Sequence, residues 1–456
     1  MKENNPHILG TEKVGKLLLE YSIPAIIGMT LTSLYNIIDS VFIGHGVGAM
    51  AISGLAISFP LMNLLVAFCT LVGVGGATIS SIRLGQKDTD GAEKVLGNVT
   101  VLCVINSIFY GGITLLFLDR ILFFFGASHD TLPYARDFMQ IILIGSPVTY
   151  VMIGLNNIMR ATGYPRKAML SSMLTVGCNI ILAPVFIFWL GWGIRGAATA
   201  TILSQFAGMI WVLSHFMQEK SYIRFKKGIF KLRKRIVENI FSIGMSPFLM
   251  NVCACVIVII INNSLQNHGG DMAIGAYGII NRLLTLYVMI VLFVMVIMGL
   301  TMGMQPIVGY NHGAHKFGRV KQTLKYCMIA GGCITSLGFA FSELFPNLVV
   351  NMFTDDKELT ALARTGLQIG VLMFPFVGIQ IVISSFFQSI GKAKISIFLS
   401  LSRQLLYLLP CLLLLPHWWG LNGIWLSMPV SDLLAFITAC LMLAHHIKKL
   451  NKITEV

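Results

Sequence analysis

Twelve long apolar runs follow one another along the chain, separated by polar residues, glycine or proline. Each exceeds the about 20 residues that a helix needs to cross the hydrocarbon of a bilayer. The first six lie at about 17–43, 50–82, 95–118, 133–159, 168–190 and 196–218, and the second six at about 237–262, 272–309, 322–345, 361–390, 395–415 and 421–446. The pattern predicts an all-α polytopic membrane protein of twelve transmembrane helices, without large domains outside the membrane.

The second six runs repeat the first six. At an offset of 228 residues, identical residues recur in the pairs Ala135/Ala363, Arg136/Arg364, Gln140/Gln368, Ile141/Ile369, Pro147/Pro375, Ile153/Ile381 and Gly163/Gly391. Leu84-Gly85 is expected to correspond to Val308-Gly309, at an offset of 224. Six helices are an even number, so both halves enter the membrane from the same side, as in parallel-repeat transporters with a binding site between the halves. We predict an N-terminal lobe at 1–218, a basic linker at 219–236 and a C-terminal lobe at 237–456.

Composition and charge agree with a membrane protein. Only 11% of the 456 residues are charged and 56% are hydrophobic, whereas about 25% are charged in an average globular protein. The net charge of +14 could suggest a nucleic-acid partner, but 27 of the 33 Lys and Arg residues fall in segments on the side of the N-terminus. By the positive-inside rule both termini are cytoplasmic, in a multi-pass protein of the plasma (inner) membrane. The linker is then expected to lie against the anionic inner leaflet.

No pattern typical of an enzyme stands out. The sequence has no Walker A, HExxH or GxSxG motif, and its nine cysteines form no CxxC pair. We therefore expect no enzymatic activity, no cofactor, no bound metal, no nucleic-acid partner and no obligate protein partner.

The first apolar run carries a carboxylate, and an ionisable group within the hydrocarbon is usually functional. Asp39 follows Thr32, Tyr35 and Asn36 at spacings that put all four on one helix face. We predict that Asp39 takes up a coupling ion and that the other three line a substrate cavity; the alternative is a carboxylate that only ties two helices together. Pro24 leaves a backbone carbonyl without its donor and permits a bend, so it is the predicted hinge.

The two halves differ in this charge. Position 259, which corresponds to Asp39 at an offset of 220, is Ile259, and ion coupling is therefore expected in the N-terminal half. Asp432 in the last run aligns with Gln205. It is either a second cation or proton site facing a substrate cavity, or a packing residue paired with Arg403. Arg282 is expected to play a structural part.

Three segments resemble the family of multidrug and toxic compound extrusion (MATE) transporters. They are the stretch Ser33–Gly46 followed by Ala51–Leu55, the motif Arg160–Gly163, and Asn179–Pro184. The resemblance covers essentially the whole chain. The seventh helix has no acidic residue, and in this respect the chain resembles the DinF-like branch of the family. It implies a V-shaped pair of six-helix bundles that exports lipophilic, often cationic compounds in exchange for inward H⁺ or Na⁺.

The resemblance also implies roles for particular residues. The first-helix carboxylate of the family matches Asp39, and its bend proline matches Pro24. The family's cation site further uses an Asn, an Asp four residues later, a backbone carbonyl and a Thr. These positions are Asn179, Ala183, Ala197 and Thr201. Because Ala183 replaces the second carboxylate, a proton suits the site better than Na⁺.

The predicted function is a secondary antiporter that exports small lipophilic cations in exchange for H⁺ bound by Asp39, with Asn179 and Thr201 as hydrogen-bond partners. Na⁺ coupling is the nearest alternative. A lipid-linked oligosaccharide flippase would need several cationic side chains in its cavity, and an enzyme acting on lipid carriers would need clustered acids or histidines. Membrane lipids are the other expected partners.

Overall fold

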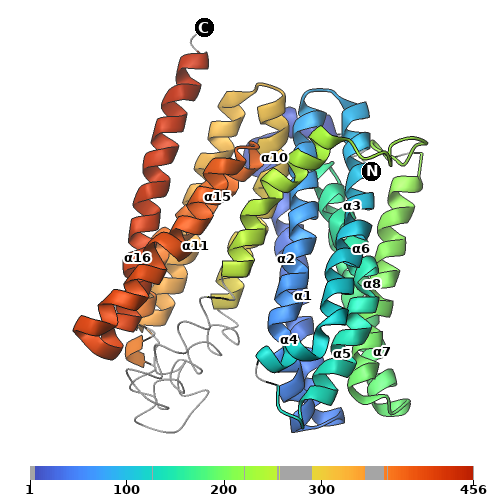
Figure 1. Ribbon diagram of the computed structural model, residues 1–456. Coiled ribbons are helices and arrows are strands. Elements are labelled where there is room, and N and C mark those ends of the chain that lie inside the picture. The colour runs from blue at the N-terminus through green and yellow to red at the C-terminus, as the bar shows by residue number, and fades with distance from the viewer. Residues whose placement is uncertain are drawn as a thin grey trace. The chain divides into compact units, whose positions relative to one another are not determined.

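The computed structural model describes residues 6–125, 127–219, 221–253, 256, 290–344, 364–366 and 368–454. Throughout these ranges the chain forms helices and the turns between them, with no strand (Figure 1). Nine of the described helices are long and apolar enough to cross a membrane, and two bent helix pairs raise the number of spans to as many as eleven. Helix α10 (Ile290–Gly313) is the described part of the remaining apolar run. The predicted all-α polytopic fold is confirmed.

The helices follow the apolar runs closely. The first half contains η1 (Pro6–Gly10), α1 (Val14–Gly46), α2 (Ala49–Gly85), α3 (Thr89–Leu116), α4 (Leu118–Phe124), α5 (Leu132–Ile144), α6 (Ser146–Ala161), α7 (Pro165–Pro184), η2 (Val185–Trp189) and α8 (Gly193–Met217). The second half contains a helix over Lys234–Cys253, α10, α11 (Phe317–Leu344), a turn of helix at Arg364–Gly370, α14 (Phe374–Ser389), α15 (Ala393–Leu401), η3 (Ser402–Leu408) and α16 (Leu409–Thr454). Helix α16 is broken at Gly420, whose φ is 52°.

One expected helix in each half is bent in the structure. The run at 133–159 divides into α5 and α6, which meet at 56°, and the run at 361–390 divides at 46° before α14. Pro147 and Pro375 stand in the first turn after each break. A proline ring has no N–H and cannot continue the preceding hydrogen-bond ladder, although it is tolerated where a new helix starts. The bends recur at the 228-residue offset, as a true structural repeat requires.

Two glycines end helices in the same way in the two halves. Gly163 after α6 and Gly391 after α14 have φ of 107° and 74°, a region that side chains with a Cβ rarely adopt. The residue after each glycine donates its N–H to the carbonyl five residues earlier, over 3.1 and 2.9 Å. This glycine cap explains why Gly163 and Gly391 recur in the repeat.

The crossing of α2 with the end of α10 is built on glycines. A Cβ at Gly85 would lie 2.0 Å from the carbonyl oxygen of Tyr310, and a Cβ at Gly313 would lie 2.2 Å from that of Ile82. Gly85 and Gly313 are 228 residues apart, and so are Ile82 and Tyr310, so the crossing is reciprocal. The expected counterpart of Gly85, Gly309, is therefore wrong, and Gly313 takes its place.

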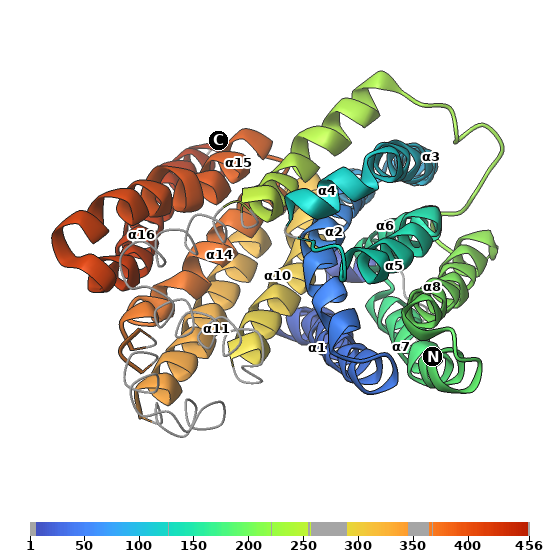
Figure 2. The same ribbon diagram turned by 60° about the horizontal axis from the view of Figure 1, so that its bottom comes forward.

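The chain forms two compact units. Unit 1 comprises Met1–Lys13, Ile23–Phe248 and Gly309–His315, and unit 2 comprises Val14–Ser22, Leu249–Val308 and Lys316–Val456. Each unit thus takes segments from both halves of the sequence, and α1 passes from unit 2 to unit 1 between Ser22 and Ile23. Within unit 1, α7 packs along α8 and α6 packs against α2 and α3 (Figure 2). The predicted lobe boundaries remain a sequence-based prediction.

Candidate functional site

Asp39 lies buried in the second half of α1. Its side chain is 8% exposed, and its Oδ1 atom has no hydrogen-bond partner. Among the described residues no lysine, arginine or histidine forms an ion pair with it. Burying an unpaired charged carboxylate costs several kcal/mol. A proton or a cation is therefore needed to compensate its charge.

The helix face next to Asp39 was predicted to carry further site residues. Thr32 donates its hydroxyl to the carbonyl of Gly28, one turn earlier, over 2.9 Å. This is a local bond within α1, common for threonine in apolar helices. The side chains of Tyr35 and Asn36 lie outside the described part of the structure.

Helix α7 runs beside α1 in the same direction. At one end, a Cβ at Gly28 would lie 3.9 Å from the side chain of Ser172. At the other end, the rings of Phe42 and Phe188 meet edge to face with centroids 6.4 Å apart. Between these two contacts lie Asp39 on α1 and Asn179 on α7. Asp39 comes three residues before Phe42, whereas Asn179 comes nine residues before Phe188, so Asp39 lies nearer to the Phe42–Phe188 contact than Asn179 does.

Asn179 and Thr201 meet across α7 and α8. The side-chain amide of Asn179 donates to Thr201 Oγ1 over 3.2 Å, and the threonine hydroxyl donates in turn to the carbonyl of Ala197 over 3.1 Å. Both side chains are buried, at 3% and 7% exposed. The structure thus brings together two of the three predicted ion-coupling residues and the backbone carbonyl expected beside them.

Two alanines complete the surroundings of this pair. Ala183, one turn after Asn179, and Ala197 are both fully buried. A methyl group at 183 offers no oxygen ligand and no charge. Asp39 is thus the one carboxylate among the residues singled out on α1, α7 and α8.

The predicted hinge lies where α1 changes unit. Pro24 is inside the helix, two residues after Ser22, where the unit 2 segment of α1 ends. As proline has no N–H, the carbonyl four residues earlier, on Glu20, loses its helical donor. The break in the ladder therefore coincides with the passage between units, and the hinge role remains a prediction.

Asp432 lies in α16, within unit 2, and is paired. Arg403 Nε donates to Asp432 Oδ1 over 2.7 Å, and Arg403 lies in the π-helical segment η3. This is the partnership with Arg403 that the sequence offered as the alternative to a cation site. A role of Asp432 in substrate binding remains a prediction, and Arg282 lies outside the described residues.

The sequence did not single out two polar residues of α6. Thr149 donates its hydroxyl to the side-chain oxygen of Gln205 on α8, which ties α8 to the helix that starts at the bend. The hydroxyl of the neighbouring Tyr150 is fully buried and has no hydrogen-bond partner. For the Thr149–Gln205 pair, the only signal in the sequence was the alignment of Gln205 with Asp432. In the described part of the chain, no group of three or more His, Cys, Asp or Glu residues could hold a metal ion.

Comparison with known proteins extends over the whole chain. The MatE family model matches residues 24–185 and 247–413. The multidrug export protein MepA of Staphylococcus haemolyticus is 28% identical over 444 residues, which are 97% of this chain and 95% of the relative. MepA of Staphylococcus aureus strain NCTC 8325 is 27% identical over 451 residues, 97% and 96% of the two chains.

Solved structures show the same fold. A crystal structure of a MATE protein in the bent conformation matches with a TM-score of 0.92 at 23% identity, over 100% of both chains. The outward-facing conformation of a multidrug resistance MATE family transporter of the MOP superfamily matches with a TM-score of 0.88 at 23% identity, over 99% of both chains. The family model alone covers most of the residues, including α1 from Pro24 to Asp39 and α7 with Asn179. The chain therefore belongs to the MATE family of multidrug efflux transporters.

Proposed function

We propose that this protein is an H⁺-coupled antiporter that exports lipophilic, cationic compounds, with Asp39 as the proton-binding group and with both termini in the cytoplasm. The observation that carries the proposal is the buried Asp39 carboxyl, which has an oxygen without a partner. The methyl group of the buried Ala183, where a second carboxylate is missing, favours H⁺ over Na⁺. Neutralising one carboxylate takes one proton, whereas a Na⁺ ion needs several oxygen ligands around it.

The proposed cycle follows from the charge of one group. When Asp39 is protonated from outside, its negative charge disappears, and the free-energy cost of keeping this carboxyl buried in α1 falls. A ligand or proton shifts a conformational equilibrium only by its differential affinity for the two states. The cation and the proton must therefore favour different states of the protein, with Pro24 as the point where α1 bends. Release of the proton to the cytoplasm resets the protein.

The Arg403–Asp432 pair argues against the flippase alternative. An anionic lipid-linked headgroup would need cationic side chains that are free to bind it. The Arg403 guanidinium is already engaged by a carboxylate at 2.7 Å, so its charge is compensated within unit 2.

The direct test is ethidium efflux from proteoliposomes with either a pH gradient or a Na⁺ gradient imposed. We expect the pH gradient alone to drive transport, and the Na⁺ gradient alone to leave it at the rate of protein-free vesicles. Asp137→Asn is the matched control for a substitution of Asp39, because the Asp137 carboxylate is paired with Arg195 through an ion pair of 2.8 Å. Transport driven only by Na⁺ would show that oxygens other than a second carboxylate complete a Na⁺ site. Absence of transport under both gradients would favour the flippase.

Restoring the missing acid should change the coupling ion. Ala183→Asp puts a second carboxylate one helical turn from Asn179, in a fully buried position. Two carboxylates and the amide and hydroxyl oxygens of Asn179 and Thr201 are ligands that Na⁺ accepts. We expect efflux of this variant to respond to a Na⁺ gradient, and Ala183→Asn, which adds a similar volume without the charge, not to respond. An unchanged ion dependence in Ala183→Asp would contradict the single-carboxylate explanation.

A further inference from the structure

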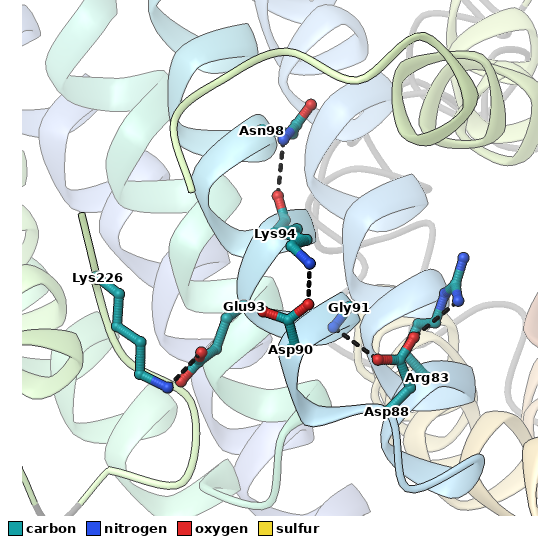
Figure 3. A network of polar contacts seen from close by, with 8 residues as sticks. All are labelled: Arg83, Asp88, Asp90, Gly91, Glu93, Lys94, Asn98 and Lys226. Atoms are coloured by element: carbon teal, nitrogen blue, oxygen red, sulfur yellow. Dashed lines mark hydrogen bonds and ion pairs between the residues drawn. The ribbon is translucent and has the colours of Figure 1, made fainter. Parts of the chain in front are cut away.

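The linker between the two halves is fixed to α3 rather than free. Lys226 Nζ lies 2.6 Å from Oε2 of Glu93, whose side chain is 3% exposed (Figure 3). The side chain of Asn98, five residues further along α3, donates to the carbonyl of Lys231 over 3.1 Å and accepts the backbone N–H of Arg233 over 2.9 Å. An amide that donates and accepts in this way holds both the position and the direction of the linker backbone.

The backbone of α3 is shaped for this contact. A Cβ at Gly97 would lie 2.3 Å from the carbonyl oxygen of Ile229, a distance that side chains do not tolerate. Glycine at 97 therefore lets the linker lie directly on α3. The end of α8 adds a further contact, because His215 Nε2 and Ser221 Oγ are 3.2 Å apart.

The apolar side chains of the linker fall into a buried group and an exposed group. Ile223, Ile229 and Ile236 are buried, at 0%, 5% and 8% exposed. In contrast, Phe230 and Leu232 are 46% and 47% exposed, and Phe230 stacks on Phe225 with ring centroids 5.7 Å apart. The fixed linker thus presents an apolar edge away from the protein.

Along the linker, basic residues alternate with the exposed apolar residues Phe230 and Leu232. One charge, on Lys226, is engaged by Glu93. The exposed basic residues are Lys227, Lys231, Arg233, Lys234 and Arg235, and no acidic residue occurs between 221 and 237. The nearest acid, Glu238, lies 4.0 Å from Lys234 in an exposed pair that contributes little.

The segment lies where spans begin and end. One candidate span ends at Met217, the next begins at Lys234, and α3 begins at Thr89. A segment that joins such helix ends lies at the boundary between hydrocarbon and water. At that boundary aromatic side chains are favoured and basic side chains attract anionic headgroups.

We propose that residues 227–235 form a binding surface for anionic phospholipid headgroups. Lys227, Lys231 and Lys234 contact the phosphates, and Phe230 and Leu232 enter the interfacial layer between them. Because Glu93 and Asn98 hold the linker in place, the surface is preformed and does not need to order on binding. This inference is independent of the coupling ion and depends only on the chain being embedded in a membrane.

Quenching by brominated lipids tests the proposal on the full-length protein. The variant Phe230→Trp is reconstituted into phosphatidylcholine vesicles that contain brominated phosphatidylglycerol or brominated phosphatidylcholine at equal mole fractions. The signal of the six native tryptophans is measured on the unsubstituted protein and subtracted. We expect a preference for phosphatidylglycerol of at least about fivefold, the factor that one basic side chain contributes near an anionic surface.

Three further variants make the test specific. Removing Lys227, Lys231 and Lys234 together by substitution with Gln should abolish the preference, whereas the same change at three exposed lysines elsewhere, Lys325, Lys394 and Lys448, should leave it intact. Gly97→Ala should weaken it without changing any charge, because the added Cβ displaces Ile229 and with it the linker.

Three outcomes would overturn the proposal. Equal quenching by both lipids would show that the surface does not select anionic headgroups. No quenching by either lipid would place the segment in water and point to a soluble acidic partner instead. If Gly97→Ala kept the preference for phosphatidylglycerol, the basic charges alone would be sufficient for it, and the fixed geometry of the linker would not contribute. Thermal unfolding of each variant is compared with that of the unsubstituted protein, so that a folding defect is recognised.

Discussion

The substitution Asp39→Asn should reduce gradient-driven efflux to the rate of vesicles without protein. Asparagine keeps the size and hydrogen-bonding capacity of the side chain but can neither take up nor release a proton. In the structure no other carboxylate among the predicted coupling residues can replace it, because Ala183 carries a methyl group. Binding of ethidium, followed by its fluorescence, should persist, since we assign the coupling ion to Asp39 and the substrate cavity to Thr32, Tyr35 and Asn36.

Two comparisons sharpen this expectation. Asp39→Glu keeps a titratable group and should retain part of the efflux, whereas Asp137→Asn removes a half-buried carboxylate that is paired with Arg195 and should retain all of it. Efflux at the normal rate in Asp39→Asn would refute the assignment of the coupling site. Loss of both efflux and ethidium binding would mean that Asp39 contacts the substrate itself.

The substitution Gly85→Ala should destabilise the folded protein by about 2 to 3 kcal/mol. The added Cβ would lie 2.0 Å from the carbonyl oxygen of Tyr310, and a backbone atom in a helix cannot rotate away. Helices α2 and α10 would have to separate, and overpacking of this kind typically costs about 1–3 kcal/mol. Gly313→Ala should have a similar effect, because its Cβ would meet the carbonyl oxygen of Ile82 at 2.2 Å.

Thermal unfolding in detergent, detected with a thiol-reactive dye, measures this loss. The buried cysteines Cys69 and Cys103 become reactive only when the fold opens. Gly112→Ala is the matched control, since nothing lies within 4 Å of a Cβ at that helical position. Alanine there should be neutral or stabilising by up to about 1 kcal/mol, because glycine is a poor helix former. Unfolding of Gly85→Ala at the temperature of the unsubstituted protein would contradict the close crossing.

Hydrophobic patterning predicted most of the fold because few backbone conformations are stable within a bilayer. Backbone groups in hydrocarbon must be satisfied within the segment, so a long apolar run forms a helix. The bends at Pro147 and Pro375 escaped the prediction, since an apolar run stays apolar across a proline. They became visible only when the helix axes were known, although the recurrence of the two prolines was already in the sequence.

Contacts between helices were harder to predict. The Asn179–Thr201 pair was expected from the spacing that the family resemblance supplied, and no periodicity within either helix would have produced it. Thr149 and Gln205, on helices far apart in sequence, were missed because two ordinary polar residues carry no sign of their partner. The Asn98 side chain that holds the linker was missed for the same reason: the linker carbonyl and N–H that it binds have no sequence signature.

The division of the chain into units has a consequence for its synthesis. Gly75 and Gly85 of α2 are inserted early, yet the backbones that pack on them belong to Ile240 and Tyr310. Unit 1 is therefore incomplete until the segment Gly309–His315 has left the ribosome, and the opening residues of α1 wait longer still for the rest of unit 2. A gene divided at the linker would encode two fragments, neither of which contains a whole unit. Although the chain repeats itself, each half of the repeat therefore needs segments of the other half to complete a compact unit.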